Sequence, residues 1–217
     1  MLKYILFDLD GTLNNSGYGI RKSIRYALAK FNLSEPLESN LNRMIGPPLI
    51  DGFMEFYGLS REDAVKGRCY YREYYDVKGK FECEIYDGIK DLMDALSKLN
   101  VKLGVCTSKP SIYSLEVLEH IGIKHYFDFL EGASLDGAIS EKEEIIKIAL
   151  DKFSIEKESA IMIGDRKFDI AGAKSNGIKS IGVTYGFGTR EELVNANADY
   201  IVDSTLELKN LLLSLYK

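Results

Sequence analysis

Short apolar runs recur along the chain, and longer stretches with helical spacing separate them. The runs are nearly continuous instead of alternating with polar residues, which is typical of strands that are buried on both faces. They lie at residues 4–7, 101–106, 127–130, 160–163, 180–183 and 200–202. The helical patterns lie at residues 89–99, 112–121, 143–153, 168–176 and 206–215. This alternation predicts an α/β fold: a doubly wound parallel sheet with helices on both faces and a functional site at the carboxyl ends of its strands.

One segment after the first strand breaks this alternation. Residues 14–84 carry helical patterns at 20–31, 49–57 and 61–77 without strand-like runs. Gly46-Pro47-Pro48 must interrupt any helix there, because proline lacks the amide hydrogen and restrains the residue before it. We therefore predict a catalytic core made of residues 1–14 and 85–217, with an inserted all-helical domain made of residues 15–84.

The composition narrows the classes of protein that the chain fits. Its 217 residues are 46% hydrophobic and 28% charged with four prolines, which excludes collagen, coiled coils and low-complexity disorder. The net charge of −5 argues against nucleic acid as a partner, because the summed field would repel a phosphate backbone. The first apolar run is short and reaches Asp8 at once, so neither a signal peptide nor a membrane span is expected. We expect a cytoplasmic protein with reduced cysteines.

Paired acids follow two of the predicted strands. Asp8 and Asp10 end the first strand in the stretch FDLDGT, and Asp165 and Asp169 follow the strand at 160–163. Carboxylates so close together repel each other unless a cation lies between them, and Mg²⁺ is the natural candidate. Taken alone, each pair could equally be a turn or a helix cap, so the acids by themselves leave both interpretations open.

A pair of hydroxyls and one lysine stand before predicted helices. Thr107 and Ser108 follow the second core strand, where hydroxyls and the amides of a helix start can bind phosphate oxygens. Ser140 and Glu143 have the spacing of a capping box, which places Lys142 in the first turn of the next helix. The helix dipole disfavours a cation there, so an anionic partner is expected. Alone, these features are ordinary helix caps and a solvated lysine.

Together these residues resemble the four motifs of the haloacid dehalogenase superfamily of phosphohydrolases. The resemblance rests on DLDGT at 8–12, Thr107-Ser108, Lys142, and Gly164-Asp165 with Asp169. It covers the whole chain, including a helical cap inserted after the first strand. It is closest to phosphoglycolate phosphatase-like members, through TSKP at 107–110, SLDG at 134–137 and YGFG at 185–188.

The resemblance implies a role for each residue of the core set. Asp8 is implied as the nucleophile that forms an aspartyl-phosphate, and Asp10 as the general acid and then the general base. Thr107 and the backbone amide of Ser108 are implied to hold a phosphate oxygen, while Lys142 neutralises its charge.

The resemblance also implies a Mg²⁺ cofactor. Its ligands would be Asp8, the main-chain carbonyl of Asp10, and Asp165, with Asp169 binding directly or through a water.

The inserted domain is implied to close over the site and to select the leaving group. Arg43, with Arg21, Lys22 and Arg25, is a candidate for reading the substrate. The prediction is a magnesium-dependent phosphatase of a small phosphorylated metabolite, phosphoglycolate phosphatase-like. A 5′-nucleotidase or other small-metabolite phosphatase and a sugar phosphomutase of the same fold stay open, as does the oligomeric state. A dehalogenase would lack the second acid, and a receiver domain would be shorter.

Overall fold

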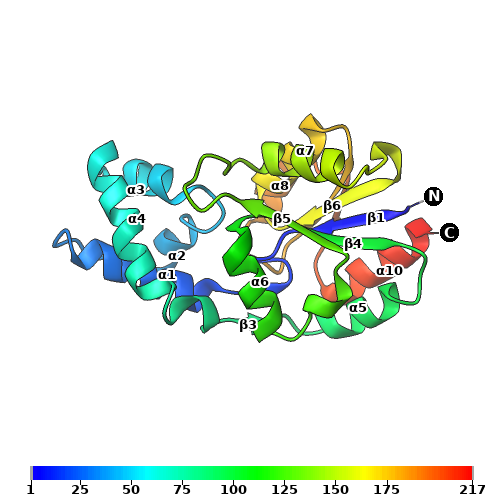
Figure 1. Cartoon of the computed structure of the whole chain (residues 1–217), viewed down its shortest axis with the longest axis horizontal. Helices are drawn as coiled ribbons and strands as arrows, with labels where there is room; N and C mark the ends of the chain where they lie inside the picture. The colour runs from blue at the N-terminus through cyan, green and yellow to red at the C-terminus, as the bar shows by residue number, and fades with distance from the viewer. Residues whose placement is uncertain (1, 217) are drawn as a thin grey trace. The chain divides into compact units, whose positions relative to one another are not determined.

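The computed structural model describes residues 2–216 and divides the chain into two compact units (Figure 1). Unit 1 comprises Met1–Asn14 and Ile85–Lys217, and unit 2 comprises Asn15–Glu84. Unit 2 is thus the segment in which the sequence shows no strand-like runs. The chain passes between the units through two short strands, β2 (Asn14–Asn15) and β3 (Glu84–Ile85), which pair with each other.

Unit 1 is built on a six-stranded parallel sheet with the strand order β5-β4-β1-β6-β7-β8. The strands are β1 (Tyr4–Phe7), β4 (Lys102–Pro110), β5 (Phe129–Ala133), β6 (Ala160–Gly164), β7 (Lys179–Val183) and β8 (Tyr200–Val202). β1 and β6 are buried along nearly their whole length, as the continuous apolar runs predict. The predicted α/β fold with a doubly wound parallel sheet is confirmed.

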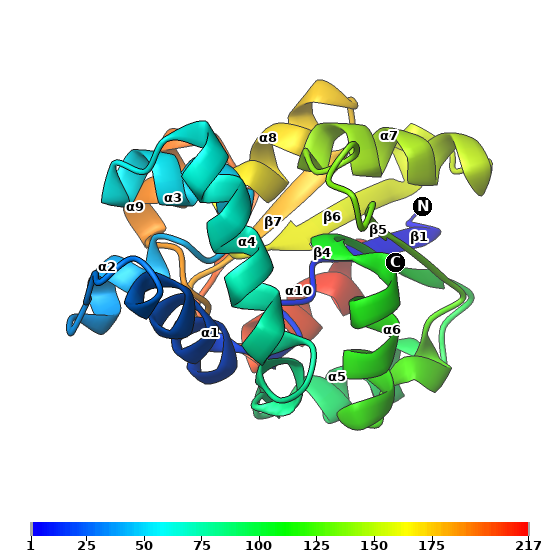
Figure 2. The same ribbon diagram turned by 60° about the vertical axis from the view of Figure 1, so that its left-hand side comes forward.

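Helices cover both faces of this sheet (Figures 1 and 2). α7 (Lys142–Lys152) and α8 (Lys167–Ser175) lie on one face, and α5 (Ile89–Leu96), α6 (Ser111–His120) and α10 (Thr205–Tyr216) lie on the other. The short α9 (Arg190–Asn195) packs near β7 and β8. Under α7 and α8 the core is a cluster of fully buried aliphatic side chains, including Leu6, Ile145, Ile146 and Met162. This packing fixes the helix starts at the carboxyl edge of the sheet.

The position of β1 in the middle of the sheet brings distant loops together. Phe7 pairs with Val105 of β4 on one side and with Ile163 of β6 on the other. The residues that follow these three partners therefore leave the sheet at the same edge, where sites form in open parallel sheets.

Unit 2 is helical. It contains α1 (Gly17–Ala29), α2 (Glu38–Asn42), α3 (Leu49–Tyr57), α4 (Arg61–Tyr75) and the 3-10 turn η1 (Gly79–Phe81). α4 packs against both α1 and α3. Gly19 of α1 allows η1 to approach closely, since a Cβ there would lie 1.9 Å from the carbonyl oxygen of Gly79. Within residues 2–216, no helix combines the length and the apolar character needed to cross a bilayer.

One predicted helix cap is wrong. α7 begins at Lys142 with Glu141 as its N-cap residue, and no side chain caps this helix. The predicted capping box of Ser140 and Glu143 therefore does not form. At the start of α8 a side chain does cap the backbone, because Asp169 Oδ2 accepts a hydrogen bond from the Arg166 amide at 3.1 Å.

Candidate active site

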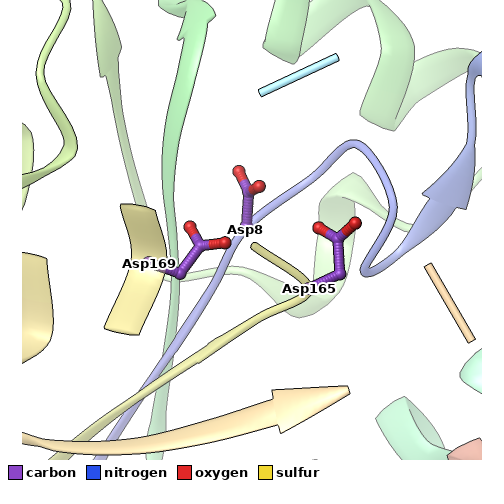
Figure 3. Close-up of side chains that lie close together, drawn as sticks. All are labelled: Asp8, Asp165 and Asp169. Atoms are coloured by element: carbon purple, nitrogen blue, oxygen red, sulfur yellow. The ribbon is translucent and has the colours of Figure 1, made fainter. Parts of the chain in front are cut away.

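Three buried carboxylates lie together at the carboxyl edge of the sheet (Figure 3). Asp8 directly follows β1, Asp165 directly follows β6, and Asp169 lies in the first turn of α8. One oxygen from each lies within 4.8 Å of the others. Their residues are only 8%, 0% and 1% exposed. The structure thus brings together three of the four acids singled out in the sequence.

The carboxylates disturb one another's ionisation. Burial, together with the charges of Asp169 and Asp8, raises the pKa of Asp165 well above its ordinary value. Burial and the charge of Asp8 also raise the pKa of Asp169 to about 6, although Lys142 acts in the opposite direction. A divalent cation would relieve this repulsion, and clustered carboxylate oxygens are the ligands that Mg²⁺ and Ca²⁺ prefer. The donor set therefore fits a hard divalent cation.

Lys142 is the only ammonium that the structure records against two of these acids within residues 2–216. Its Nζ lies 2.8 Å from Oδ1 of Asp8 and 2.7 Å from Oδ1 of Asp169, and it donates to the carbonyl oxygen of Cys106 at 3.1 Å. Burial lowers the pKa of Lys142, but the two carboxylates outweigh burial and raise it. The anionic partner expected for a cation at this helix start is therefore this pair of acids.

Backbone amides hold two of the acids in place. Asp165 accepts a hydrogen bond from the Phe187 amide at 2.7 Å, and Asp169 accepts one from the Arg166 amide at 3.1 Å. The Thr12 hydroxyl donates to the other oxygen of Asp165 at 3.4 Å. A Cβ at Gly188 would lie 1.9 Å from the carbonyl oxygen of Asp165, so only glycine lets this loop pack there.

Asp10 lies two residues after Asp8 and forms an ion pair with a different lysine, Lys109. Lys109 Nζ lies 2.8 Å from both Oδ1 and Oδ2 of Asp10. Lys109 is not among the site residues predicted from the sequence. Its signal is its place in the TSKP stretch, directly after the two hydroxyl residues.

Thr107 and Ser108 lie at the end of β4, next to β1. Thr107 is buried and its Oγ1 accepts a hydrogen bond from the Lys109 amide at 3.3 Å, while Ser108 is half-buried. Cys106 is fully buried in the same strand, and burial raises the pKa of its thiol to about 12. Cys106 is therefore a core residue of β4.

Arg43 lies in unit 2, at the end of α2, with its guanidinium 4.2 Å from the centre of the Phe56 ring. The other candidate cap residues have partners in the same unit: Arg21 contacts Asn42, and Arg25 donates to the carbonyl oxygen of Glu35. Their contact with substrate stays a prediction.

A parallel sheet that gathers three carboxylates and a buried lysine at its carboxyl edge defines an α/β enzyme with a phosphoryl-transfer type of site. The chain belongs to the haloacid dehalogenase-like hydrolase family, whose model matches residues 5–183. The resemblance to this superfamily is confirmed.

Curated relatives carry several names. A 5′-nucleotidase from Pseudomonas aeruginosa is 42% identical over 87% of this chain and 86% of its own length. A tyrosine-protein kinase, PtkA, from Mycobacterium tuberculosis is 33% identical over 91% of this chain and 67% of its own. A phosphoglycolate phosphatase from Vibrio parahaemolyticus is 29% identical over 95% of this chain and 94% of its own.

A solved structure extends this likeness to three dimensions. The crystal structure of a predicted phosphatase from Clostridium acetobutylicum is 48% identical, covers 99% of both chains and superimposes with a TM-score of 0.96. Together with the family match, these relatives identify the chain as an enzyme of the phosphatase type within the superfamily.

Proposed function

We propose that this chain is a magnesium-dependent phosphatase that hydrolyses a small phosphomonoester through an aspartyl-phosphate on Asp8. The observation that carries the proposal is the position of Lys142, whose ammonium lies between the carboxylates of Asp8 and Asp169. Such an ammonium can neutralise charge on a transferring phosphoryl group without reorganisation. The family match supports this assignment.

In this proposal Asp8 attacks phosphorus in line and displaces the alcohol. Asp10 protonates the departing oxygen and then removes a proton from the water that cleaves the aspartyl-phosphate. Thr107 and the amide of Ser108 hold a phosphate oxygen, and Lys142 offsets the negative charge that gathers beside Asp8.

Asp8, the carbonyl of Asp10, Asp165 and Asp169 are the proposed ligands of Mg²⁺. When bound, the ion supplies positive charge that offsets repulsion between the acids and an anionic substrate. The raised pKa values of Asp165 and Asp169 support this assignment, because they reflect burial and the repulsion of neighbouring carboxylates, which a divalent cation would relieve.

The substrate is the finer part of the proposal. A nucleoside 5′-monophosphate is supported by the name of the relative at 42% identity, and phosphoglycolate by the name of the relative at 29%. A sugar phosphomutase with the same core residues stays an open alternative. We propose that unit 2 is the cap that selects among these esters, with Arg43 as a candidate contact. A cytoplasmic location stays a prediction.

The direct test is phosphate release from a panel that contains nucleoside 5′-monophosphates, phosphoglycolate and sugar phosphates. The panel is run with Mg²⁺ and then with chelator, and Asp8→Asn is the inactive control. Magnesium-dependent release by the wild type and none by the variant supports the proposal. If phosphate is transferred to a sugar or a tyrosine and is not released as inorganic phosphate, the chain is a phosphotransferase and the proposal of hydrolysis is wrong.

A further inference from the structure

The carboxyl end of β4 contains an irregularity that places two extra residues beside the site. Thr107 pairs with Gly132 of β5, but the next pair joins Pro110 to Ala133. Ser108 and Lys109 therefore have no partner residue of their own on β5. Bulges of this kind change the direction of a side chain and occur next to active sites.

The backbone around this bulge is closely packed. A Cβ at Gly132 would lie 2.5 Å from the carbonyl oxygen of Lys109, so the bulge requires glycine on the neighbouring strand. The Gly132 amide donates to Ser111 Oγ at 2.9 Å, and Ser114 Oγ donates to the Lys109 carbonyl at 3.3 Å. These contacts fix the position of the Lys109 backbone.

The side chain of Lys109 leads back to Asp10. Its Nζ lies 2.8 Å from each carboxylate oxygen, and the side chains of Lys109 and Asp10 are 5% and 16% exposed. This pair is largely shielded from solvent, unlike exposed ion pairs, which contribute little to stability. Because both oxygens contact one ammonium, the carboxylate cannot turn without losing a contact.

We infer that Lys109 is a positioning residue: it holds the side chain of Asp10 in place, so that the Asp10 carboxyl group, when protonated, can donate its proton to the leaving oxygen and become the carboxylate. The inference rests on the proposed function. The same backbone segment carries Thr107, so the hydroxyl proposed to bind phosphate and the ammonium that orients Asp10 are held two residues apart. Lys109 acts on the reaction through Asp10 and does not contact the substrate.

A series of esters with different leaving groups tests the inference. The oxygen of an alkyl leaving group must be protonated as it departs. The 4-nitrophenolate released from 4-nitrophenyl phosphate is a stable anion and departs readily without a proton. We expect Lys109→Met to lower kcat/KM for an alkyl phosphate by about 10²-fold and for the aryl phosphate by about fivefold or less, because general acid catalysis contributes on this scale. The value of kcat/KM is the readout, because it reports only the steps up to and including departure of the leaving group.

Four further variants accompany this measurement. Asp10→Asn removes the acid itself, and adding Lys109→Met to it should cost little more if both act as one unit. Lys109→Arg should restore much of the alkyl phosphate activity, because a guanidinium also contacts both oxygens of a carboxylate. Lys152→Met removes an exposed ion pair with Glu131 and is the matched control.

Several results would overturn the inference. Equal losses on both esters would assign Lys109 to the phosphoryl group or to folding, and a rise in KM alone would assign it to substrate binding. Unchanged or improved turnover of the alkyl ester would remove the role altogether. If Lys109→Met is unstable, Lys109→Gln answers the same question. Absence of magnesium-dependent hydrolysis by the wild type would instead refute the proposed function.

Discussion

The ammonium of Lys142 lies 2.8 Å from Oδ1 of Asp8, although the two residues are 134 positions apart in the chain. The contact joins the first turn of α7 to the end of β1 and runs through the interior, since the two side chains are 4% and 11% exposed. Asp8 therefore shares a buried cation with Asp169, and the carboxylate of Asp165 lies nearby. Such a cation suits a carboxylate that accepts a phosphoryl group and must be shielded from its charge.

Removing the ammonium should impair catalysis strongly. We expect Lys142→Met to lower kcat/KM by about 10²-fold or more, because a preorganised charge at the phosphoryl site is lost. The variant also removes the positive charge that offsets the buried carboxylates of Asp8 and Asp169, so Tm in the absence of metal should fall. Lys147→Met is the control, because Lys147 lies on the same helix and is exposed. Comparable activity of the two variants would contradict the assigned role.

The nucleophile can be tested with a nearly isosteric change. Asp8→Asn should abolish turnover of every ester, because an amide is far less nucleophilic than a carboxylate. The fold should persist, since asparagine has nearly the same shape as aspartate and removing one of the three clustered acids relieves repulsion. Circular dichroism and phosphate release together check this expectation. A variant that keeps full activity on any ester would exclude Asp8 as the nucleophile.

The sequence predicts the sheet well because its strands are buried on both faces. A continuous apolar run such as 160–163 is typical of a strand buried on both faces, and β6 (Ala160–Gly164) forms at these residues and is buried. The acids at the strand ends could be predicted for the same reason, since parallel strands deliver them to one edge. Two short helices, α2 and α9, were not predicted. Only Leu41 in α2 and Leu193 in α9 are buried, so neither has an apolar stripe to detect.

The missing parts of the site depend on irregular backbone. The TSKP stretch places Lys109 near the site but does not predict where its side chain points, because that direction follows from the bulge of β4 against Gly132. The capping box predicted at Ser140 does not form, although Lys142 lies in the first turn of α7 as predicted. The partners of Lys142, Asp8 and Asp169, come from other parts of the chain, so a local capping pattern carries no information about them.

The loop after β7 should be intolerant of even a small side chain. We expect Gly188→Ala to destabilise the protein by about 1–3 kcal/mol, the usual cost of forcing atoms into a packed site. The new Cβ would meet the carbonyl oxygen of Asp165 at 1.9 Å, so magnesium affinity should also fall.

Urea unfolding and magnesium titration measure the two effects of Gly188→Ala. Gly122→Ala is the control, because Gly122 has a φ of 76° but open space around its Cβ position. Its cost should therefore come from backbone conformation alone. Equal losses of stability and of magnesium affinity in both variants would show that the contact with Asp165 is unimportant.

Asp165 should lower the stability of the metal-free protein at neutral pH, although it is a proposed metal ligand. Its pKa is raised well above the ordinary value of 3.8, so the folded metal-free protein retains a proton that the unfolded chain releases. Stability from this group is therefore greatest below about pH 4 and falls as pH rises further, because the folded state binds more protons. Asp165→Asn should remove this slope and raise Tm of the metal-free protein at pH 7. Each kcal/mol gained corresponds to about 2–4 °C for a chain of this size.

Added Mg²⁺ separates the wild type from Asp165→Asn. A cation that binds only the folded state at 100 times its dissociation constant stabilises it by about 2.7 kcal/mol, so the wild type should gain Tm with Mg²⁺ and lose it with chelator. The variant should show neither change, because one of the three clustered carboxylates is gone. Asp128→Asn, directly before β5 at the opposite edge of the sheet, should respond to Mg²⁺ as the wild type does. A magnesium response that persists in Asp165→Asn would place the ion elsewhere and leave the raised pKa as a structural cost without a metal to explain it.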